Sequence, residues 1–331
     1  PEAYLAFIER HPDASLFHHP QWHRALMLGL PDIGVSTAYY GLTDSAGALK
    51  GAFPVFSYRK YGVAFRGIHL PRLATPATPP LLAGCTWDAF LDAVEGWVRR
   101  QSFPYFRIVM PQAFSDECRS GGSFELEEHR NLELDLRAPL KAAWPKVGRK
   151  IRKAIRSGVR VHLGRPARFM EIYRPMLEET YGWQGKEPNI PDTLYRAVLE
   201  DSFLCRHLRL VYASMSGQAV AGAWFFHDRQ RSYFWDGASL RVARNPCANH
   251  LIHWSNIRWS KRIGLTVYDM VGSGCGRDKE RPGIGRFKRS FGATMQHYPV
   301  VVVWQGRLIR TALHAYREFR LRFSGGRHHE P

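Results

Sequence analysis

The chain has 331 residues, of which 45% are hydrophobic and 13% are aromatic. This apolar content is ample for packed cores and excludes a disordered chain, and the length predicts more than one domain. Lys and Arg number 47 against 29 Asp and Glu, a formal net charge of +18, so the field of the whole molecule attracts anions such as phosphorylated substrates, nucleic acid or anionic lipid.

The spacing of the cysteines and the hydropathy pattern indicate the cellular compartment of the protein. The five cysteines form no CxxC pair, which predicts reduced thiols and no disulfide framework. No stretch approaches the roughly 18 apolar residues of a membrane span, and residues 1–15 lack the regions of a signal peptide. We therefore expect a cytoplasmic protein, and contact with the inner face of the membrane stays open because the charge favours it.

The first part of the chain alternates helices and strands. The pattern predicts helices at 4–9, within 16–28 and at 87–101, and strands within 36–42, within 51–65 and at 105–110. Residues 70–80 contain four prolines, which cannot donate to a strand ladder, so this segment is predicted to be a loop.

The composition changes abruptly after this first part. Residues 137–168 contain no acid, and their basic residues are Arg137, Lys141, Lys146, Arg149, Lys150, Arg152, Lys153, Arg156, Arg160, Arg165 and Arg168. Apolar residues recur there every three or four positions, which predicts an amphipathic helix over 141–158 with a cationic outer face. This helix marks a domain junction, and its outer face either is solvated or contacts RNA or lipid.

The second part repeats the alternation. We expect helices at 168–181 and 193–201, and then strands at 207–214, 218–228 and 231–240. A turn at 216–218 makes the first two strands antiparallel. A long helix over 250–263 should end at Gly264, before a strand over 265–271. This order of elements is that of an acetyltransferase-type fold, and the similar order of the two halves indicates an internal duplication.

The segment 268–292 has the character of a site. It reads YDMVGSGCGRDKERPGIGRFKRSFG: the end of an apolar strand, a glycine-rich loop, and then an aromatic residue beside a lysine. Backbone amides of such a loop, together with one fixed cation, can bind an anion.

Four segments carry a family resemblance: SLFHHPQWHRAL, KVGRKIRKAIRSGV, NHLIHWSNIRWSKRIGLTVYDMVGS and GIGRFKRSFGA. The chain resembles the FemAB-like branch of the acetyltransferase (GNAT) superfamily, which includes peptidoglycan bridge-forming aminoacyltransferases and exopolysaccharide-associated FemAB proteins. The resemblance implies an α/β fold with mixed sheets, in two tandem GNAT-like (acyl-CoA N-acyltransferase) domains packed together. The expected division is residues 1–140, residues 141–295, and a C-terminal strand and helix at 296–331 that returns to the first domain.

The activity that the resemblance implies is acyl or aminoacyl transfer to an amino group of a peptidoglycan or exopolysaccharide precursor. We expect no tightly bound cofactor, and aminoacyl-tRNA and acyl-CoA both stay open as donors. In this fold a coenzyme A pyrophosphate sits on the loop after Leu240, where Cys247 and Asn249 replace the expected small residues. The expected partners are an anionic small-molecule or lipid-linked acceptor and, as donor, tRNA, but not DNA. The alternatives are an acetyl-CoA-dependent N-acetyltransferase and a noncatalytic anion- or RNA-binding protein.

Three residues are candidates for catalysis. Lys288 matches the motif lysine that the resemblance assigns to the oxyanion of the tetrahedral intermediate, with Phe287 holding its stem; the alternative is a surface lysine beside a core phenylalanine. Asp236 and Asp269 are acids within apolar strands, and either could accept the proton of the amine or serve only in a cap or ion pair.

Further residues are candidates for substrate binding. Arg286 and Arg289 could bind phosphate or remain solvated. Three aromatic candidates lie in predicted strands, where they either line a pocket or belong to the core: Tyr233, Trp235 and Tyr268.

Two remaining sets are weaker. Asn249 matches an asparagine of the exopolysaccharide-linked members or caps a helix, while Arg59 and Lys60 lie where related enzymes hold a sugar-nucleotide pyrophosphate. The histidine clusters at 18–23 and 250–253 lack the spacing of metal ligands, so we expect no metal.

Overall fold

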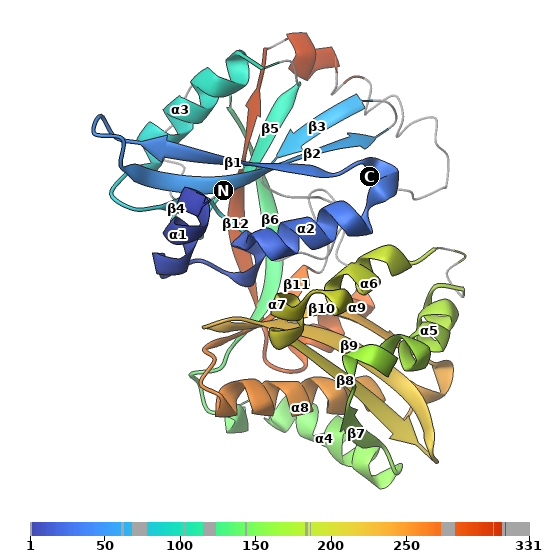
Figure 1. Cartoon of the computed structure of the whole chain (residues 1–331). Helices are drawn as coiled ribbons and strands as arrows, with labels where there is room; N and C mark the ends of the chain where they lie inside the picture. The colour runs from blue at the N-terminus through green and yellow to red at the C-terminus, as the bar shows by residue number, and fades with distance from the viewer. Residues whose placement is uncertain are drawn as a thin grey trace.

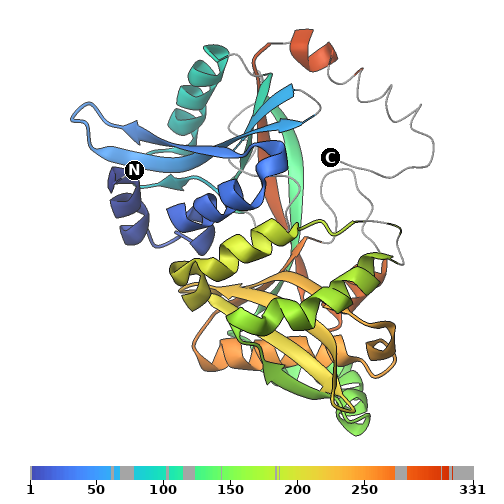
Figure 2. The same cartoon turned by 45° about the vertical axis from the view of Figure 1, so that its right-hand side comes forward.

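The structure, a computed structural model, describes residues 2–60, 63–67, 78–101, 104–114, 124–142, 144–182, 185, 187–272, 282–306, 308–312 and 315. Within these residues twelve strands form one continuous sheet in the order β1-β2-β3-β5-β12-β6-β11-β10-β9-β8-β7, with β4 paired to β2 off this path. Figures 1 and 2 show two α/β halves that this sheet joins. The fold is therefore a mixed α/β fold, as the sequence predicted.

The first half contains the predicted helices and strands and two strands that were not predicted, at 81–82 and 124–135. Its elements are α1 (Glu2–Arg10), η1 (Leu16–His18), α2 (Pro20–Gly29), η2 (Pro31–Ile33), β1 (Ser36–Thr43), β2 (Leu49–Lys60), β3 (Val63–Gly67), β4 (Leu81–Leu82), α3 (Trp87–Arg99), β5 (Tyr105–Val109) and β6 (Phe124–Asp135). The run expected within 51–65 is two antiparallel strands, β2 and β3. Helix α3 begins where the Thr86 side chain accepts the Ala89 N–H, and its apolar side, including Phe90 and Val98, is buried. Of the predicted loop at 70–80, residues 70–77 lie outside the described residues.

The second half contains the predicted meander. Its elements are η4 (Leu140–Ala142), α4 (Trp144–Arg156), β7 (Arg160–Leu163), α5 (Pro166–Gly182), α6 (Asp192–Glu200), α7 (Ser202–Arg206), β8 (Leu208–Met215), β9 (Gln218–His227), β10 (Arg231–Ser239), η5 (Arg241–Ala243), α8 (Ala248–Arg262), β11 (Val267–Gly272), α9 (Pro282–Arg289) and β12 (Thr294–Trp304). Strands β8 and β9 are antiparallel, and β10 and β11 are parallel. Helix α8 gives way to β11 after Gly264, whose φ of 87° is the left-handed conformation that glycine tolerates best.

The halves are joined by β6 and β12. Strand β6 pairs with β12 along most of its length, and its last residues pair with β11. Strand β12 also pairs with β5, so a strand that follows the second half in the sequence lies inside the sheet of the first half. Figure 1 shows β12 and β6 running together between the halves. The sheet of the first half is thus completed by the C-terminal part of the chain.

A shared apolar core also joins the halves. One cluster of buried side chains contains Trp22 and Leu26 of α2 together with residues of α5, α6, β9 and β10. The approach of α2 to α6 is close: a Cβ at Gly29 would lie 2.5 Å from the Cα of Leu194. The Thr193 hydroxyl donates to the Gly29 carbonyl at 2.7 Å. On the other face of the second-half sheet, α4 and α8 cover a separate cluster. In the described part of the chain no helix has the length and hydropathy to span a bilayer.

Candidate active site

Lys288 lies on α9, and its side chain is only 4% exposed. Its ammonium donates to the carbonyl of Val271 at 3.0 Å and to the carbonyl of Gly272 at 2.8 Å, where β11 ends. A buried lysine is rare unless its charge is compensated. The alternative of a surface lysine is therefore wrong, and the ammonium is a fixed positive charge at the end of β11.

The backbone at the end of β11 is strained. Val271 has a φ of 58°, which is unusual for a β-branched residue, and the register of β11 against β6 shifts between Asp269 and Gly272. The Asp269 carboxylate accepts the Val271 N–H at 2.6 Å, while Lys288 binds the Val271 carbonyl. The N–H and the carbonyl of Val271 are thus each bound by an ionisable side chain. These two hydrogen bonds hold Val271 in a sparsely populated backbone conformation, as is common at functional sites.

Asp269 belongs to a buried polar cluster that contains residues of both halves. The Asn131 side chain on β6 donates to Asp269 at 3.2 Å, and His129 contacts Asn131 at 3.0 Å. Glu133, two residues farther along β6, accepts from Arg231 of β10 at 3.0 Å. The Tyr298 hydroxyl of β12 also donates to Glu133. The cluster therefore lies where the sheets of the two halves meet.

The environment of Asp269 shifts its titration. Burial is the main cause, with the neighbouring Glu133 second, and together they raise the pKa of Asp269 to about 7. Arg231, the Val271 N–H and Lys288 act in the opposite direction. A carboxyl group with a pKa near neutrality can exchange a proton under physiological conditions, which suits a general base.

Phe287 and Tyr268 lie on the other side of β11, around His253. Phe287 packs edge-on against His253 at 5.1 Å between ring centroids. The Tyr268 hydroxyl lies 2.8 Å from His253 Nδ1. Burial, with His250 and then Lys288 contributing, lowers the pKa of His253 well below its usual value, so this imidazole is neutral. Phe287 and Tyr268 are thus packed in the apolar core that lies under α8.

Asp236 lies in a different environment on β10. It is half-buried beside a bulge, and its carboxylate accepts hydrogen bonds from the hydroxyls of Tyr173, at 2.7 Å, and Tyr195. Burial raises the pKa of Asp236, against these hydrogen bonds and one from the Gly237 N–H. Its known partners are therefore side chains of α5 and α6 and its own strand, and none of them belongs to the cluster around Asp269.

The remaining candidates of β10 and α8 have structural contacts. Trp235 is 2% exposed and packs in the shared core. Tyr233 is equally buried, and its hydroxyl donates to Asp228 at 2.7 Å. Asn249 does not cap α8, because the N-cap residue is Cys247; its side chain donates to Ser239 at 3.2 Å instead.

The cationic candidates lie apart. Arg286 and Arg289 are on the exposed side of α9, whereas Arg59 is exposed near the end of β2 in the first half. The side chain of Lys60 lies outside the described residues, as do residues 273–281, which contain the glycine-rich loop and Cys275. The structure thus brings Lys288, Asp269, Phe287 and Tyr268 together around β11.

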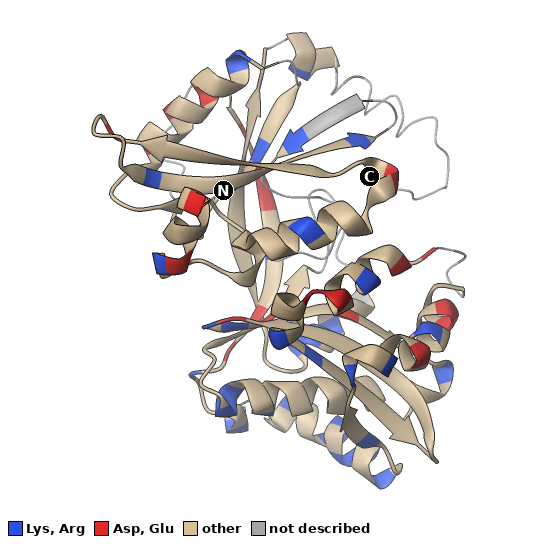
Figure 3. Ribbon diagram, viewed as in Figure 1, with Lys and Arg blue, Asp and Glu red and all other residues tan. Residues whose placement is uncertain are grey.

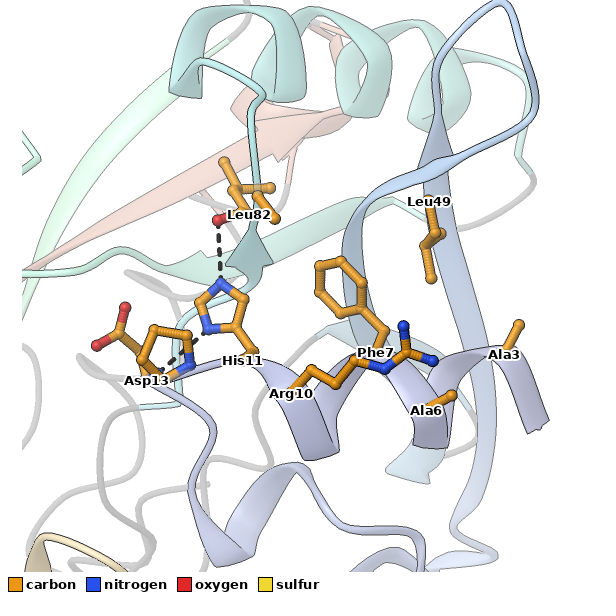
Figure 4. Close-up of a pocket in the computed structure, with 10 residues that line it drawn as sticks. Ala3, Ala6, Phe7, Arg10, His11, Asp13, Leu49 and Leu82 are labelled. Carbon is orange, nitrogen blue, oxygen red and sulfur yellow. Dashed lines mark hydrogen bonds between the residues drawn. The ribbon is translucent and has the colours of Figure 1, made fainter.

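A hollow in the first half is separate from this cluster. It lies between α1 and the strands β2 and β4, and Phe7, Arg10, Leu49 and Leu82 contribute to its lining (Figure 4). His11 at its edge is fixed by the Leu82 carbonyl at 3.0 Å and the Asp13 N–H at 3.2 Å. None of the predicted site residues lines this hollow.

Sequence reasoning missed Asn131, Glu133, Arg231 and Tyr298. One signal was present: the alternate residues of β6 that share a face with Asn131 are all polar or charged, from Glu125 to Asp135. A strand with one continuous polar face inside a large sheet indicates a buried polar cluster or a wet cleft.

Known proteins resemble this chain in a part of its sequence and in its overall fold. Residues 145–289 match the family model described as an acetyltransferase (GNAT) domain. A crystal structure of FemX is similar to the chain with a TM-score of 0.62 and 12% identity, over 90% of this chain and 95% of that chain. Residues 145–289 thus match a domain of the acetyltransferase (GNAT) kind, and the chain as a whole is similar in fold to FemX. The matched range includes Lys288, Asp269 and Asp236.

Two further structures share the fold of the chain. L-PGS from Bacillus licheniformis has a TM-score of 0.52 at 11% identity, over 91% of this chain and 96% of that chain. A tandem GNAT protein from the clavulanic acid biosynthesis pathway has a TM-score of 0.50 at 11% identity, over 92% and 94% of the two chains. A search of curated protein sequences finds no match. The family model thus matches the second half of the chain, and the solved structures share the fold of both halves at low identity.

Proposed function

We propose that the chain is an acyl or aminoacyl transferase that forms an amide on an amino group of a peptidoglycan or exopolysaccharide precursor. The observation that carries this proposal is the buried ammonium of Lys288, held at the end of β11 beside a carboxyl group that titrates near neutrality. The FemAB-like fold supports the reaction class, and the net charge of +18 suits an anionic small-molecule or lipid-linked acceptor.

The chemistry follows from the two charges. The amine of the acceptor attacks the acyl carbonyl of the donor, and the carbonyl oxygen acquires negative charge in the tetrahedral intermediate. A fixed ammonium in a water-poor site stabilises this charge more than it stabilises the neutral carbonyl, so Lys288 lowers the barrier. Asp269, in its ionised form, takes the proton from the amine. The intermediate then collapses, and the oxygen or sulfur of the donor leaves.

We propose that the acyl donor is either aminoacyl-tRNA or acyl-CoA and that the protein has no tightly bound cofactor. A thermal-shift screen distinguishes them, because a ligand that binds only the folded state raises the melting temperature in a saturable way. The donor that stabilises the protein is then used in an amide-forming assay with amino-sugar and peptide acceptors.

The decisive variant is Lys288→Ala, and the chain offers a matched control. Lys261 also directs its ammonium at main-chain carbonyls, those of Leu136, Arg137 and Ala138, but it does so near the end of α8. We expect Lys288→Ala to lower kcat by roughly 100-fold or more, the scale of a lost oxyanion donor. Lys261→Ala removes a similar capping interaction and should leave kcat within a few-fold of the native value.

Stability measurements complete the test. Both variants should unfold at a lower denaturant concentration than the native protein, since each loses a lysine that caps carbonyl groups. Equal kcat values for the two variants would show that Lys288 has a structural role only. A chain that binds RNA with steep salt dependence but shows no turnover with either donor would instead be the noncatalytic anion-binding protein.

A further inference from the structure

The helical layer formed by α4 and α8 carries positive charge without any acidic residue. The two segments that build it, 136–170 and 237–268, contain no Asp and no Glu. Figure 3 shows Lys and Arg along α4 and toward the C-terminal end of α8, at the end of the second half that lies away from the first half. Arg137, before α4, pairs with Asp135 at 2.9 Å, but the basic residues along α4 have no acidic residue within their own layer, so their field extends into solvent.

The outer side of α4 concentrates this charge. Its exposed basic residues are Lys146, Arg149, Arg152, Lys153 and Arg156. Among the described residues, none of these five belongs to an ion pair; Lys153 donates to Asn245 at 2.6 Å, and Arg152 lies over the Trp144 ring at 5.6 Å. Cations that have no acidic partner need an external anion or solvent to compensate them.

The apolar side of α4 limits how the helix can bind. Val147, Ile151 and Ala154 are buried in the core under α8, so this side is not available for insertion into a bilayer. One aliphatic side chain nevertheless projects into solvent: Ile155 is 58% exposed and follows Lys153 by two positions. On the neighbouring strand β7, Leu163 is 61% exposed. The surface is thus cationic with isolated aliphatic side chains.

This combination favours a bilayer surface over a nucleic acid. Lys and Arg next to a membrane attract anionic headgroups, and exposed aliphatic side chains gain from contact with the interface. Proteins that bind single-stranded nucleic acid instead present exposed aromatic rings on which bases stack. In the described residues of α4 and β7 no aromatic side chain is exposed.

We propose that the outer side of α4 binds the anionic headgroups of a lipid bilayer. Arg149, Arg156 and Lys146 supply the attraction, and Ile155 contacts the interfacial region. The helix remains packed on α8, so binding is peripheral and does not require unfolding. This inference rests on the surface of α4 and stands whether or not the proposed acyl transfer is correct.

Vesicle co-sedimentation tests the proposal with the full chain. The probe is a set of vesicles of phosphatidylcholine with and without phosphatidylglycerol, at low and physiological salt. We expect binding to the anionic vesicles only. The variant Lys146→Gln/Arg149→Gln/Arg156→Gln should bind them roughly 30- to 100-fold more weakly, because each cation near such a surface contributes independently.

The matched control removes the same charge elsewhere. Arg24, Arg100 and Arg196 are also exposed and lie on α2, after α3 and on α6. The variant Arg24→Gln/Arg100→Gln/Arg196→Gln should lose only a few-fold in affinity. Equal losses in the two variants would overturn the proposal, because a diffuse net charge would then account for binding.

Two further outcomes decide between partners. Ile155→Ser should weaken vesicle binding a few-fold at physiological salt, and an unchanged affinity would remove the aliphatic contact from the proposal. If the α4 variant keeps its affinity for anionic vesicles but loses affinity for bulk tRNA, the surface binds RNA and the lipid proposal is wrong. Melting temperatures of all variants near the native value exclude unfolding as the cause.

Discussion

Two carboxyl groups on neighbouring strands, Asp236 of β10 and Asp269 of β11, gave the same signal in the sequence and have opposite surroundings in the structure. Asp236 accepts from two tyrosine hydroxyls inside an aromatic core. Asp269 lies among charged groups, with Glu133, Arg231 and Lys288 all acting on its titration. The comparison shows that an acid within an apolar strand indicates a carboxyl group inside the fold, but not its role. The groups that surround the carboxyl group in the structure distinguish a structural carboxyl group from a reactive one.

The partners of each acid give the physical reason for the difference. Tyr173 and Tyr195 are neutral, and both donate a hydrogen bond to the same carboxylate oxygen of Asp236. That oxygen is therefore not free to accept a proton from a substrate. Around Asp269 the charges of Glu133 and Lys288 oppose each other, and small changes of position alter the balance. We therefore place Asp269 in the proposed mechanism and assign Asp236 to the stability of the second half.

The largest expected effect on stability comes from Asp236→Ala. This change leaves two buried tyrosine hydroxyls without their acceptor and creates a small cavity, and we expect it to lower the free energy of unfolding by about 3–5 kcal/mol. Asp236→Asn keeps the size and one acceptor oxygen, so it should cost less. Urea unfolding at constant pH measures both. A loss below 1 kcal/mol (roughly the value of one hydrogen bond) for the alanine variant would contradict the structural assignment.

The second effect concerns the pH dependence of stability through Asp269. Because its pKa rises from 3.8 to about 7 on folding, the stability that it contributes is fully present below pH 4 and is lost as the pH rises through 7. Asp269→Asn removes this titration. The unfolding free energy of the variant relative to the native protein should therefore increase between pH 5 and pH 8, by about 2–4 kcal/mol.

Asp44 provides a control of opposite sign for this pH experiment. The pKa of Asp44 is lowered, chiefly by the hydrogen bond from the Ala48 N–H, so the native carboxylate contributes stability that is lost on acidification. Asp44→Asn should therefore become less stable relative to the native protein as the pH rises. If Asp269→Asn followed the same direction as Asp44→Asn, the raised pKa of Asp269 would be wrong.

The smallest effect separates the two tyrosines at Asp236. Tyr173→Phe removes one of two donors to the same oxygen and should cost about 1 kcal/mol, and Tyr195→Phe should cost a similar amount. The double variant should cost more than the sum, because the second change removes the last side-chain donor to this carboxyl group. Strict additivity of the two free-energy changes would indicate that the hydroxyls act independently.

The sequence predicted those parts of the fold whose periodicity is local. The meander β8 to β10 and the helix α8 follow from alternating and helical spacing, and the acetyltransferase order followed from them. Strand β6 was not predicted, because its sequence, FELEEHRNLELD, is rich in acids that are uncommon in strands. Its partners β11 and β12 lie far away in the chain, so no local pattern indicated the pairing.

The residues of the candidate site were likewise predicted only where the signal is local in the sequence. Lys288 and Asp269 came from a family motif and from an acid in an apolar strand, and the structure places both at the end of β11. Asn131 and Glu133 were not found, since their relation to Asp269 depends on the register between β6 and β11. A shift of one residue in that register would turn both side chains to the opposite face of the sheet.

The position of β12 has a consequence for how the protein is made. Strands β5 and β6 emerge from the ribosome early, yet the strand that lies between them is β12, near the C-terminal end of the described chain. Until β12 is synthesised, both strands present unpaired backbone edges to other nascent chains. The sheet of the first half can therefore be completed only after the second half has been translated, although the first half precedes it in the gene.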